Sequence, residues 1–126
     1  MTREEFQTYR TLTNKFYEDC ENLFLYIKKN YVSVLSFDNK SEFCRGDYDN
    51  DDISIIYCYQ GHYYDEDQKH IHIPINSFFD DPYKWIDEWA KEIIAEKEAT
   101  RQRLNDIAEQ KERDEYERLK KKFETK

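Results

Sequence analysis

The sequence has few of the residues that break regular secondary structure. Only two glycines and two prolines occur among 126 residues, so tight turns can form in few places. We therefore expect long helices and strands joined by polar loops, with no flexible linker. Long apolar runs are absent as well, and none is long enough to span a bilayer, so no membrane partner is expected.

Cysteine is scarce. The three cysteines, Cys20, Cys44 and Cys58, are odd in number and lack a CxxC spacing. No signal peptide precedes them, which favours reduced thiols in a cytoplasmic protein. Cys20 falls in the apolar stripe of a predicted helix, and this position favours a small core residue over a reactive thiol.

Basic residues are few in the part of the chain that holds the aromatic residues. Residues 1–95 contain 19 of the 21 aromatic residues and 19 acidic against 10 basic residues, whereas residues 96–126 contain 9 acidic and 10 basic residues. This contrast predicts an acidic, aromatic-rich α+β domain at 1–95 and a charged helical extension at 96–126. Because phosphate binding needs a basic surface, we expect no direct contact with nucleic acid.

Apolar periodicity predicts the elements of the domain. A capping box of Thr2 and Glu5 precedes residues 3–29, where apolar side chains recur at helical spacing. A period of two then predicts strands, which should pair as antiparallel neighbours. The strands are expected at 31–37, 53–59 and 69–75, with a short additional strand at 42–47, a turn at 38–41, an acidic loop at 47–52 and a hairpin loop at 60–68.

The C-terminal part of the chain predicts one long helix. Asp81 suits the N-cap and Pro82 the first helical position, and no glycine or proline follows before Phe123. The expected fold is therefore α+β, with an N-terminal helix, a three- to four-stranded antiparallel sheet and a long C-terminal helix with a coiled-coil-like extension.

The segment GDYDNDD is a first candidate site. Asp47, Asp49 and Asp51 stand at the first, third and fifth positions of an EF-hand-like calcium loop. However, Asp52 occupies the position of the turning glycine, and Cys58 occupies that of the closing glutamate. We therefore expect an exposed acidic loop and no metal at this segment.

Histidines form a second candidate site. His70 and His72 share one face of a predicted strand, and His62 lies across the expected hairpin, so the imidazoles could converge on a divalent metal. Surface histidines on an edge strand explain the same pattern. The sequence has no glycine-rich phosphate loop, and no serine or cysteine nucleophile with a recognisable base and oxyanion loop. We therefore favour a protein that is not an enzyme and has no cofactor.

Acidic residues also recur beside tyrosines in the predicted loops, and Asp80 and Asp81 extend the set. Carboxylates on a rigid scaffold can occupy the basic nucleic-acid channel of another protein, and tyrosines supply contact area. The alternative is that acidic loops only keep the protein soluble. The predicted partner-binding residues are Asp47, Asp49, Asp51, Asp52, Tyr63, Tyr64, Asp65, Glu66 and Asp67.

The tail carries a sparse apolar pattern. Tyr116, Leu119 and Phe123, with interleaved charges, suit a seam between two helices, most simply in a homodimer. A single solvated helix held by pairs of glutamate and lysine is the alternative.

A resemblance adds a functional expectation. The stretch HIHIPINSFFDD before a Trp-bearing helix, together with the terminal EYERLKKKFE, resembles small accessory proteins of bacteriophages and mobile elements, loosely over residues 53–126. The resemblance includes no catalytic motif and implies an anti-defence role of the anti-CRISPR kind.

We therefore predict a non-enzymatic inhibitor that mimics nucleic acid and binds a host protein with a basic nucleic-acid-binding surface. A small metal-dependent enzyme using His62, His70 and His72 is the alternative. A protein that sequesters a signalling nucleotide is a third hypothesis, and the scarcity of basic residues in the domain disfavours it.

Overall fold

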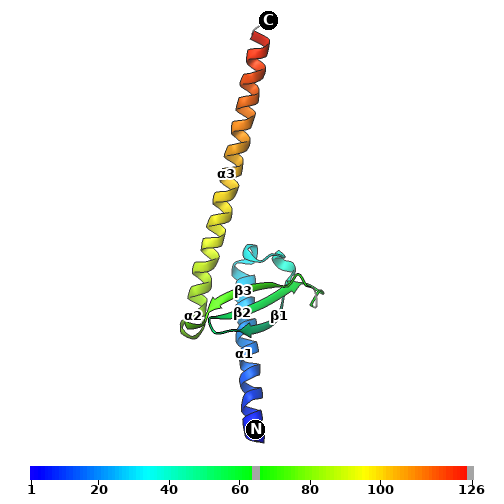
Figure 1. Cartoon of the computed structure of the whole chain (residues 1–126), viewed down its shortest axis with the longest axis vertical. Helices are drawn as coiled ribbons and strands as arrows, with labels where there is room; N and C mark the ends of the chain where they lie inside the picture. The colour runs from blue at the N-terminus through cyan, green and yellow to red at the C-terminus, as the bar shows by residue number, and fades with distance from the viewer. Residues whose placement is uncertain (64–65, 125–126) are drawn as a thin grey trace. The chain divides into compact units, whose positions relative to one another are not determined.

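The computed structural model describes residues 1–63 and 66–124, and the chain divides into two compact units, Met1–Ala90 and Lys91–Lys126. The first unit is an α+β domain, as predicted (Figure 1). The sequence-based boundary at residue 95 falls a few residues later, within a continuous helix. The elements are α1 (Arg3–Asn30), β1 (Ser41–Tyr48), β2 (Asp52–Tyr59), β3 (Lys69–Pro74), α2 (Ile75–Asp80) and α3 (Pro82–Glu124).

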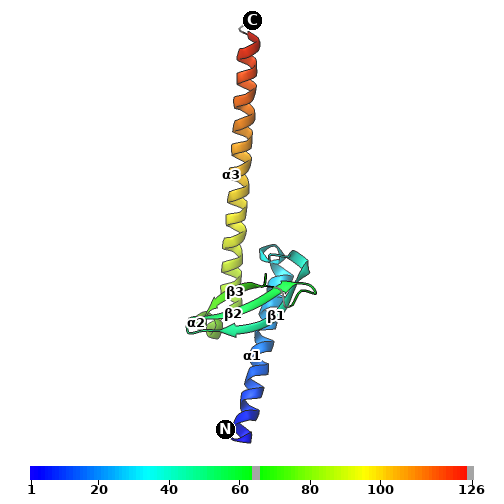
Figure 2. The same cartoon turned by 45° about the vertical axis from the view of Figure 1, so that its right-hand side comes forward.

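Helix α1 begins as the sequence predicts. The Thr2 hydroxyl accepts a 3.0 Å hydrogen bond from the backbone N–H of Glu5 and so satisfies one N-terminal donor of the helix. The buried residues of α1 all lie in its second half, and every residue up to Lys15 is exposed. Figure 2 accordingly shows the first turns of α1 extending beyond the edge of the sheet. The buried residues of α1 are Cys20, Leu23, Phe24 and Ile27.

The sheet has three antiparallel strands in the order β1-β2-β3. Alternate residues of the central strand β2 and of β3 turn towards α1, where Ile53 pairs with Ile73 and Ile55 pairs with Ile71. Helix α1 and the start of α3 cover this face and form the core with it. The opposite face, which we call the outer face, carries Glu42, Cys44, Arg45 and Asp47 from β1, Ser54, Ile56 and Cys58 from β2, and His70 and His72 from β3.

A β-bulge at Cys44 sets which residues of β1 meet α1. Phe43 pairs with Tyr57 and Arg45 pairs with Ile56, so Cys44 is one extra residue. Because of this insertion, Phe43 and Gly46 both face α1. Position 46 has room only for a glycine, since a Cβ there would lie 2.5 Å from the Sγ atom of Cys20.

The prediction of a strand at 31–37 is wrong. This segment forms a 3-10 turn at Val32–Val34, and a second one follows at Asp38–Lys40. The backbone N–H of Ser36 donates to the Tyr57 hydroxyl at 3.0 Å, and that of Phe37 donates to the Ser41 hydroxyl at 3.2 Å. These donors therefore bond to side chains instead of a neighbouring strand. The residues of this segment that pack on the core are Tyr31, Val34, Leu35 and Phe37, and they do not alternate as the inward residues of a strand would.

Two other boundaries differ from the prediction. The expected loop at 47–52 is shorter, because Asp47 lies in β1 and Asp52 lies in β2, and the ladder reaches Tyr48 paired with Ile53. Ile75, expected to end the last strand, instead begins α2. Asp80 accordingly lies in a helix and not in a loop.

The start of α3 agrees with the prediction. The Asp81 carboxylate accepts a 3.1 Å hydrogen bond from the backbone N–H of Lys84, as an N-cap does. Ile86 and Ala90 are buried in the domain core, and Trp85 and Trp89 pack beside them with their rings stacked. In the second unit every described residue except Ile93 is exposed. None of the helices, over the part of the chain described, combines the length and apolar character needed to cross a bilayer.

Candidate partner-binding surface

The β1–β2 turn carries the first predicted acidic cluster in a fixed conformation. One oxygen of Asp49 accepts hydrogen bonds from the backbone N–H groups of Asp51 and Asp52, both at 2.8 Å. The Asp49 N–H in turn donates to the carbonyl oxygen of Asp52 at 3.0 Å. These N–H donors, Asp52 first, hold the pKa of the Asp49 carboxyl below its usual range. Asp49 therefore locks the turn, while Asp47, Asp51 and Asp52 carry charge around it.

Helix α2 braces the same turn. The N–H of Ile75, the first residue of α2, donates to the carbonyl oxygen of Asp51 at 3.0 Å. Pro74 pairs with Asp52 at the end of the ladder, so β3 leads into α2 beside the turn (Figure 1). No lysine or arginine occurs between Arg45 and Lys69, so the sequence supplies no cationic neighbour to the turn along the chain.

Aromatic rings gather next to the turn. The ring of Phe16 contacts those of Tyr48 and Phe78, with centroids 6.0 and 6.1 Å apart, and Phe79 lies against Phe78 at 5.4 Å. Although they touch this cluster, Tyr48 is 71% and Phe79 is 76% exposed. The sequence prediction missed this grouping, because it joins α1, β1 and α2. We call the set Asp47, Tyr48, Asp51, Asp52 and Phe79 the turn surface.

The second predicted cluster lies on the β2–β3 loop, at the other end of the sheet. Tyr63, Glu66 and Asp67 belong to this loop, and the predicted Tyr64 and Asp65 lie outside the described residues. The eight residues of β2 separate the two clusters, which corresponds to roughly 25 Å along an extended strand. The structure therefore divides the predicted surface into two separate patches.

Tyr63 is engaged within the protein. Its hydroxyl is hydrogen-bonded to the carboxylate of Glu42, which is the main reason why the pKa of Tyr63 is raised. The carbonyl oxygen of Tyr63 accepts a 2.5 Å hydrogen bond from Gln68, whose side-chain oxygen accepts one from Arg45 at 3.1 Å. These bonds tie Tyr63 and Gln68 to Glu42 and Arg45 on the outer face of the sheet. Tyr63 is thus less available to a partner than Tyr48.

The three histidines do not form one site. His70 and His72 stack on the outer face with ring centroids 5.8 Å apart, and Nδ1 of His72 lies 2.9 Å from the Ser54 hydroxyl. His62 instead contacts the ring of Tyr59, the last residue of β2. Among residues 1–63 and 66–124 there is no group of three or more histidine, cysteine or acidic side chains that could hold a metal ion. The metal-dependent alternative therefore has no ligand set among those residues.

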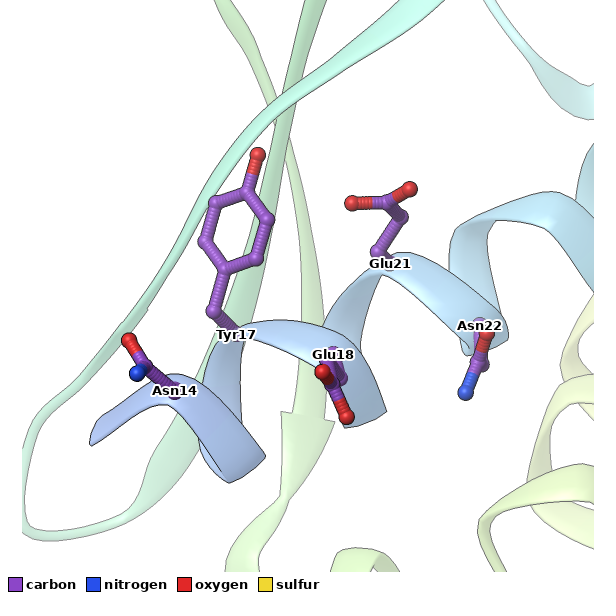
Figure 3. Close-up of a pocket in the computed structure, with 5 residues that line it drawn as sticks. All are labelled: Asn14, Tyr17, Glu18, Glu21 and Asn22. Atoms are coloured by element: carbon purple, nitrogen blue, oxygen red, sulfur yellow. The ribbon is translucent and has the colours of Figure 1, made fainter. Parts of the chain in front are cut away.

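Hollows flank the second half of α1. One of about 530 Å³ is lined only by residues of α1, with Tyr17 and Glu21 on one side and the amides of Asn14 and Asn22 on the other, beside Glu18 (Figure 3). It contains no histidine or cysteine and so offers no nucleophile with a base. A smaller hollow of about 250 Å³ includes Phe78 and Phe79 and therefore adjoins the turn surface.

The predicted seam of the tail is exposed. Tyr116, Leu119 and Phe123 are 68%, 41% and 68% exposed. Ion pairs within the helix, such as Arg118 with Glu115 at 3.6 Å and Lys120 with Glu124 at 4.0 Å, support the solvated-helix alternative. The exposed apolar side chains equally leave a face to which a second helix could bind.

Comparison with known proteins gives no match to a protein family, a curated protein or a solved structure. The resemblance to accessory proteins of bacteriophages therefore stays a prediction.

Proposed function

We propose that the protein is a non-enzymatic inhibitor of a host defence protein, of the kind that bacteriophages encode. In this proposal the turn surface binds a basic, nucleic-acid-binding surface of the target in place of nucleic acid. The protein acts in the cytoplasm and does not itself bind nucleic acid, and its tail pairs with that of a second copy. The observation that carries the proposal is a locked acidic turn beside two exposed aromatic rings.

The locked turn supports the proposal through preorganisation. Because Asp49 fixes the backbone from Asp49 to Asp52, little conformational entropy is lost when the neighbouring carboxylates meet a partner. Three carboxylates on a short turn also create a negative potential that speeds encounter with a basic surface.

The aromatic residues support a protein partner. Tyr48 and Phe79 are large, exposed and held by ring contacts to Phe16 and Phe78. Aromatic side chains of this kind supply much of the binding energy in protein interfaces, whereas peripheral charges mainly control the association rate. An acidic loop that served solubility alone would need no such rings.

The test compares two variants with equal changes in charge. In the turn variant Asp47, Asp51 and Asp52 are each replaced by Asn, and in the control variant Glu96, Glu109 and Glu112 of the second unit are each replaced by Gln. Each variant and the unmodified protein serve as bait in bacterial lysate, and captured proteins are identified by mass spectrometry. We expect a nucleic-acid-binding protein that is released by high salt and by competing nucleic acid.

The turn variant should lose this partner and the control variant should keep it. Equal capture by the turn variant would contradict the proposal, and so would the absence of any salt-sensitive partner.

A further inference from the structure

We propose that Cys44 and Cys58 form a dithiol site that reacts with small-molecule disulfides and closes into a disulfide between β1 and β2. The two sulfur atoms lie 2.8 Å apart on the outer face of the sheet, and both residues are thiols in this structure. The proposal does not depend on the inhibitory function above, because it concerns the opposite end of β2 from the turn surface.

The β-bulge brings the two sulfur atoms together. Cys58 pairs with Glu42, and Cys44 is the extra residue that the bulge inserts into β1. Both sulfur atoms also approach the carbonyl oxygen of Glu42, at 4.0 Å from Cys44 and 3.7 Å from Cys58. A disulfide bond is about 2.05 Å long, so the sulfurs need to approach by less than about 1 Å.

The two thiols differ in access to solvent. Cys58 is 1% exposed, whereas Cys44 is half-buried. The Tyr63 hydroxyl is hydrogen-bonded to Glu42, the residue that pairs with Cys58 across the sheet. Tyr63 therefore borders the pair. Because Cys44 is the more exposed of the two thiols, a small oxidant should meet it first.

The reaction is a pair of thiol–disulfide exchanges. The Cys44 thiolate attacks one sulfur of oxidised glutathione, the S–S bond of glutathione breaks, and one glutathione thiolate leaves. The Cys58 thiolate then attacks the Cys44 sulfur of the mixed disulfide, and the second glutathione thiolate leaves. Both leaving groups take up the protons lost by the cysteines. The protein dithiol is thus oxidised to one disulfide, and one glutathione disulfide is reduced to two thiols.

Cys20 serves as an internal reference. Cys20 belongs to α1 and is fully buried between this helix and the inner face of the sheet, against Gly46. Burial raises the pKa of its thiol to about 12. A thiol with so little thiolate reacts slowly with disulfides. Oxidation should therefore stop after two of the three cysteines have reacted.

The experiment titrates the full chain with mixtures of oxidised and reduced glutathione. Samples are quenched with an alkylating reagent. The mass of the intact protein is measured by mass spectrometry, and the linked cysteines are identified by peptide mapping without reductant. We expect a linked Cys44–Cys58 peptide, no lasting glutathione adduct, and Cys20 alkylated throughout. Three thiols that stay reduced across the titration would overturn the proposal, as would a link to Cys20 or a stable glutathione adduct on the unmodified protein.

Variants test the order of the two steps, with circular dichroism confirming that each is folded. Cys58→Ser should retain glutathione on Cys44, because the second thiol is missing. Cys44→Ser should stay unmodified, because Cys58 is buried, and Cys20→Ala should form the disulfide like the parent protein. Rapid glutathione addition to Cys58 in Cys44→Ser would contradict the assigned order. The peptide map of the unmodified protein tests the disulfide itself even if a variant fails to fold.

Discussion

The hydroxyl of Tyr26 donates a 2.6 Å hydrogen bond to Oδ1 of Asp87, and thereby joins α1 to the first turns of α3. Tyr31 donates to the same oxygen at 2.7 Å. The hydrogen bond to Asp87 is the main cause that raises the pKa of Tyr26 to about 12. One carboxylate thus holds two tyrosines from the C-terminal end of α1.

This bond predicts a loss of stability in alkali. The unfolded chain releases the Tyr26 proton near the ordinary pKa of 10, whereas the folded protein retains it up to about 12. The contribution of Tyr26 to the free energy of unfolding is therefore fully present below pH 10 and is lost between pH 10 and about 12. Urea unfolding over this range should show a smaller decline for Tyr26→Phe than for the unmodified protein. Equal declines would show that the bond does not contribute.

The Asp49 lock predicts the opposite dependence on pH. Because the pKa of Asp49 is lowered in the folded state, its stabilising contribution is present above the ordinary value of 3.8 and disappears as pH falls through the lower folded value. An NMR titration should show the Asp49 carboxyl protonating below the ordinary value for aspartate. Asp49→Ala should also accelerate hydrogen exchange at the N–H groups of Asp51 and Asp52, with the exchange of β3 amides as the control.

The contact between Gly46 and Cys20 predicts a large effect from one methyl group. Gly46→Ala should lower the free energy of unfolding by about 1–3 kcal/mol, the usual cost of overpacking a core. In the double variant with Cys20→Ala, denaturant unfolding should give a smaller loss than the sum of the two single losses, since the Sγ atom is gone. Strictly additive losses would mean that the two residues do not compete for space.

The exposed stripe of the tail predicts self-association. If Tyr116, Leu119 and Phe123 form a helix seam, Leu119→Asp should convert a dimer into a monomer in light scattering. Gln110→Asp adds the same charge on the opposite side of the helix and should leave the dimer intact. An unmodified protein that is monomeric at high micromolar concentration would favour the single solvated helix.

The two parts of the turn surface should affect different rate constants. Once a partner is identified, replacing Asp51 and Asp52 by Asn should slow association and weaken its dependence on salt. Replacing Tyr48 or Phe79 by Ala should mainly speed dissociation, because these rings supply contact area. Surface plasmon resonance at two salt concentrations separates the two effects. Aromatic variants with unchanged dissociation would place the contact elsewhere.

Local signals explain which elements the sequence predicts well. The caps at Thr2 and Asp81 act within four residues, and the alternating isoleucines of β2 and β3 fit only a strand. The run from Tyr31 to Phe37 fits two periods at once, since its apolar residues recur both at two and at three positions. Two hydrogen bonds decide between the two periods. They join the run to Tyr57, which is distant in sequence, and to Ser41, which lies just beyond the run.

The candidate sites depend more strongly on tertiary structure. The acidic residues of the turn are visible in the sequence, but the role of Asp49 as its lock depends on backbone geometry. Tyr48 and Phe79 join the surface only because Phe16 and Phe78 pack between α1 and α2. The Cys44–Cys58 pair requires a bulge, for which the sequence gives no signal.

That bulge also reverses the alternation of β1 midway along the strand. Before Cys44 the odd-numbered Phe43 faces the helix, and after it the even-numbered Gly46 does so, directly against Cys20. If Cys44 were retained but β1 alternated regularly, Arg45 and Asp47 would turn towards α1 in place of Gly46, and two charged side chains would meet the core. The extra residue in β1 therefore keeps both charges on the outer face and leaves the glycine against Cys20.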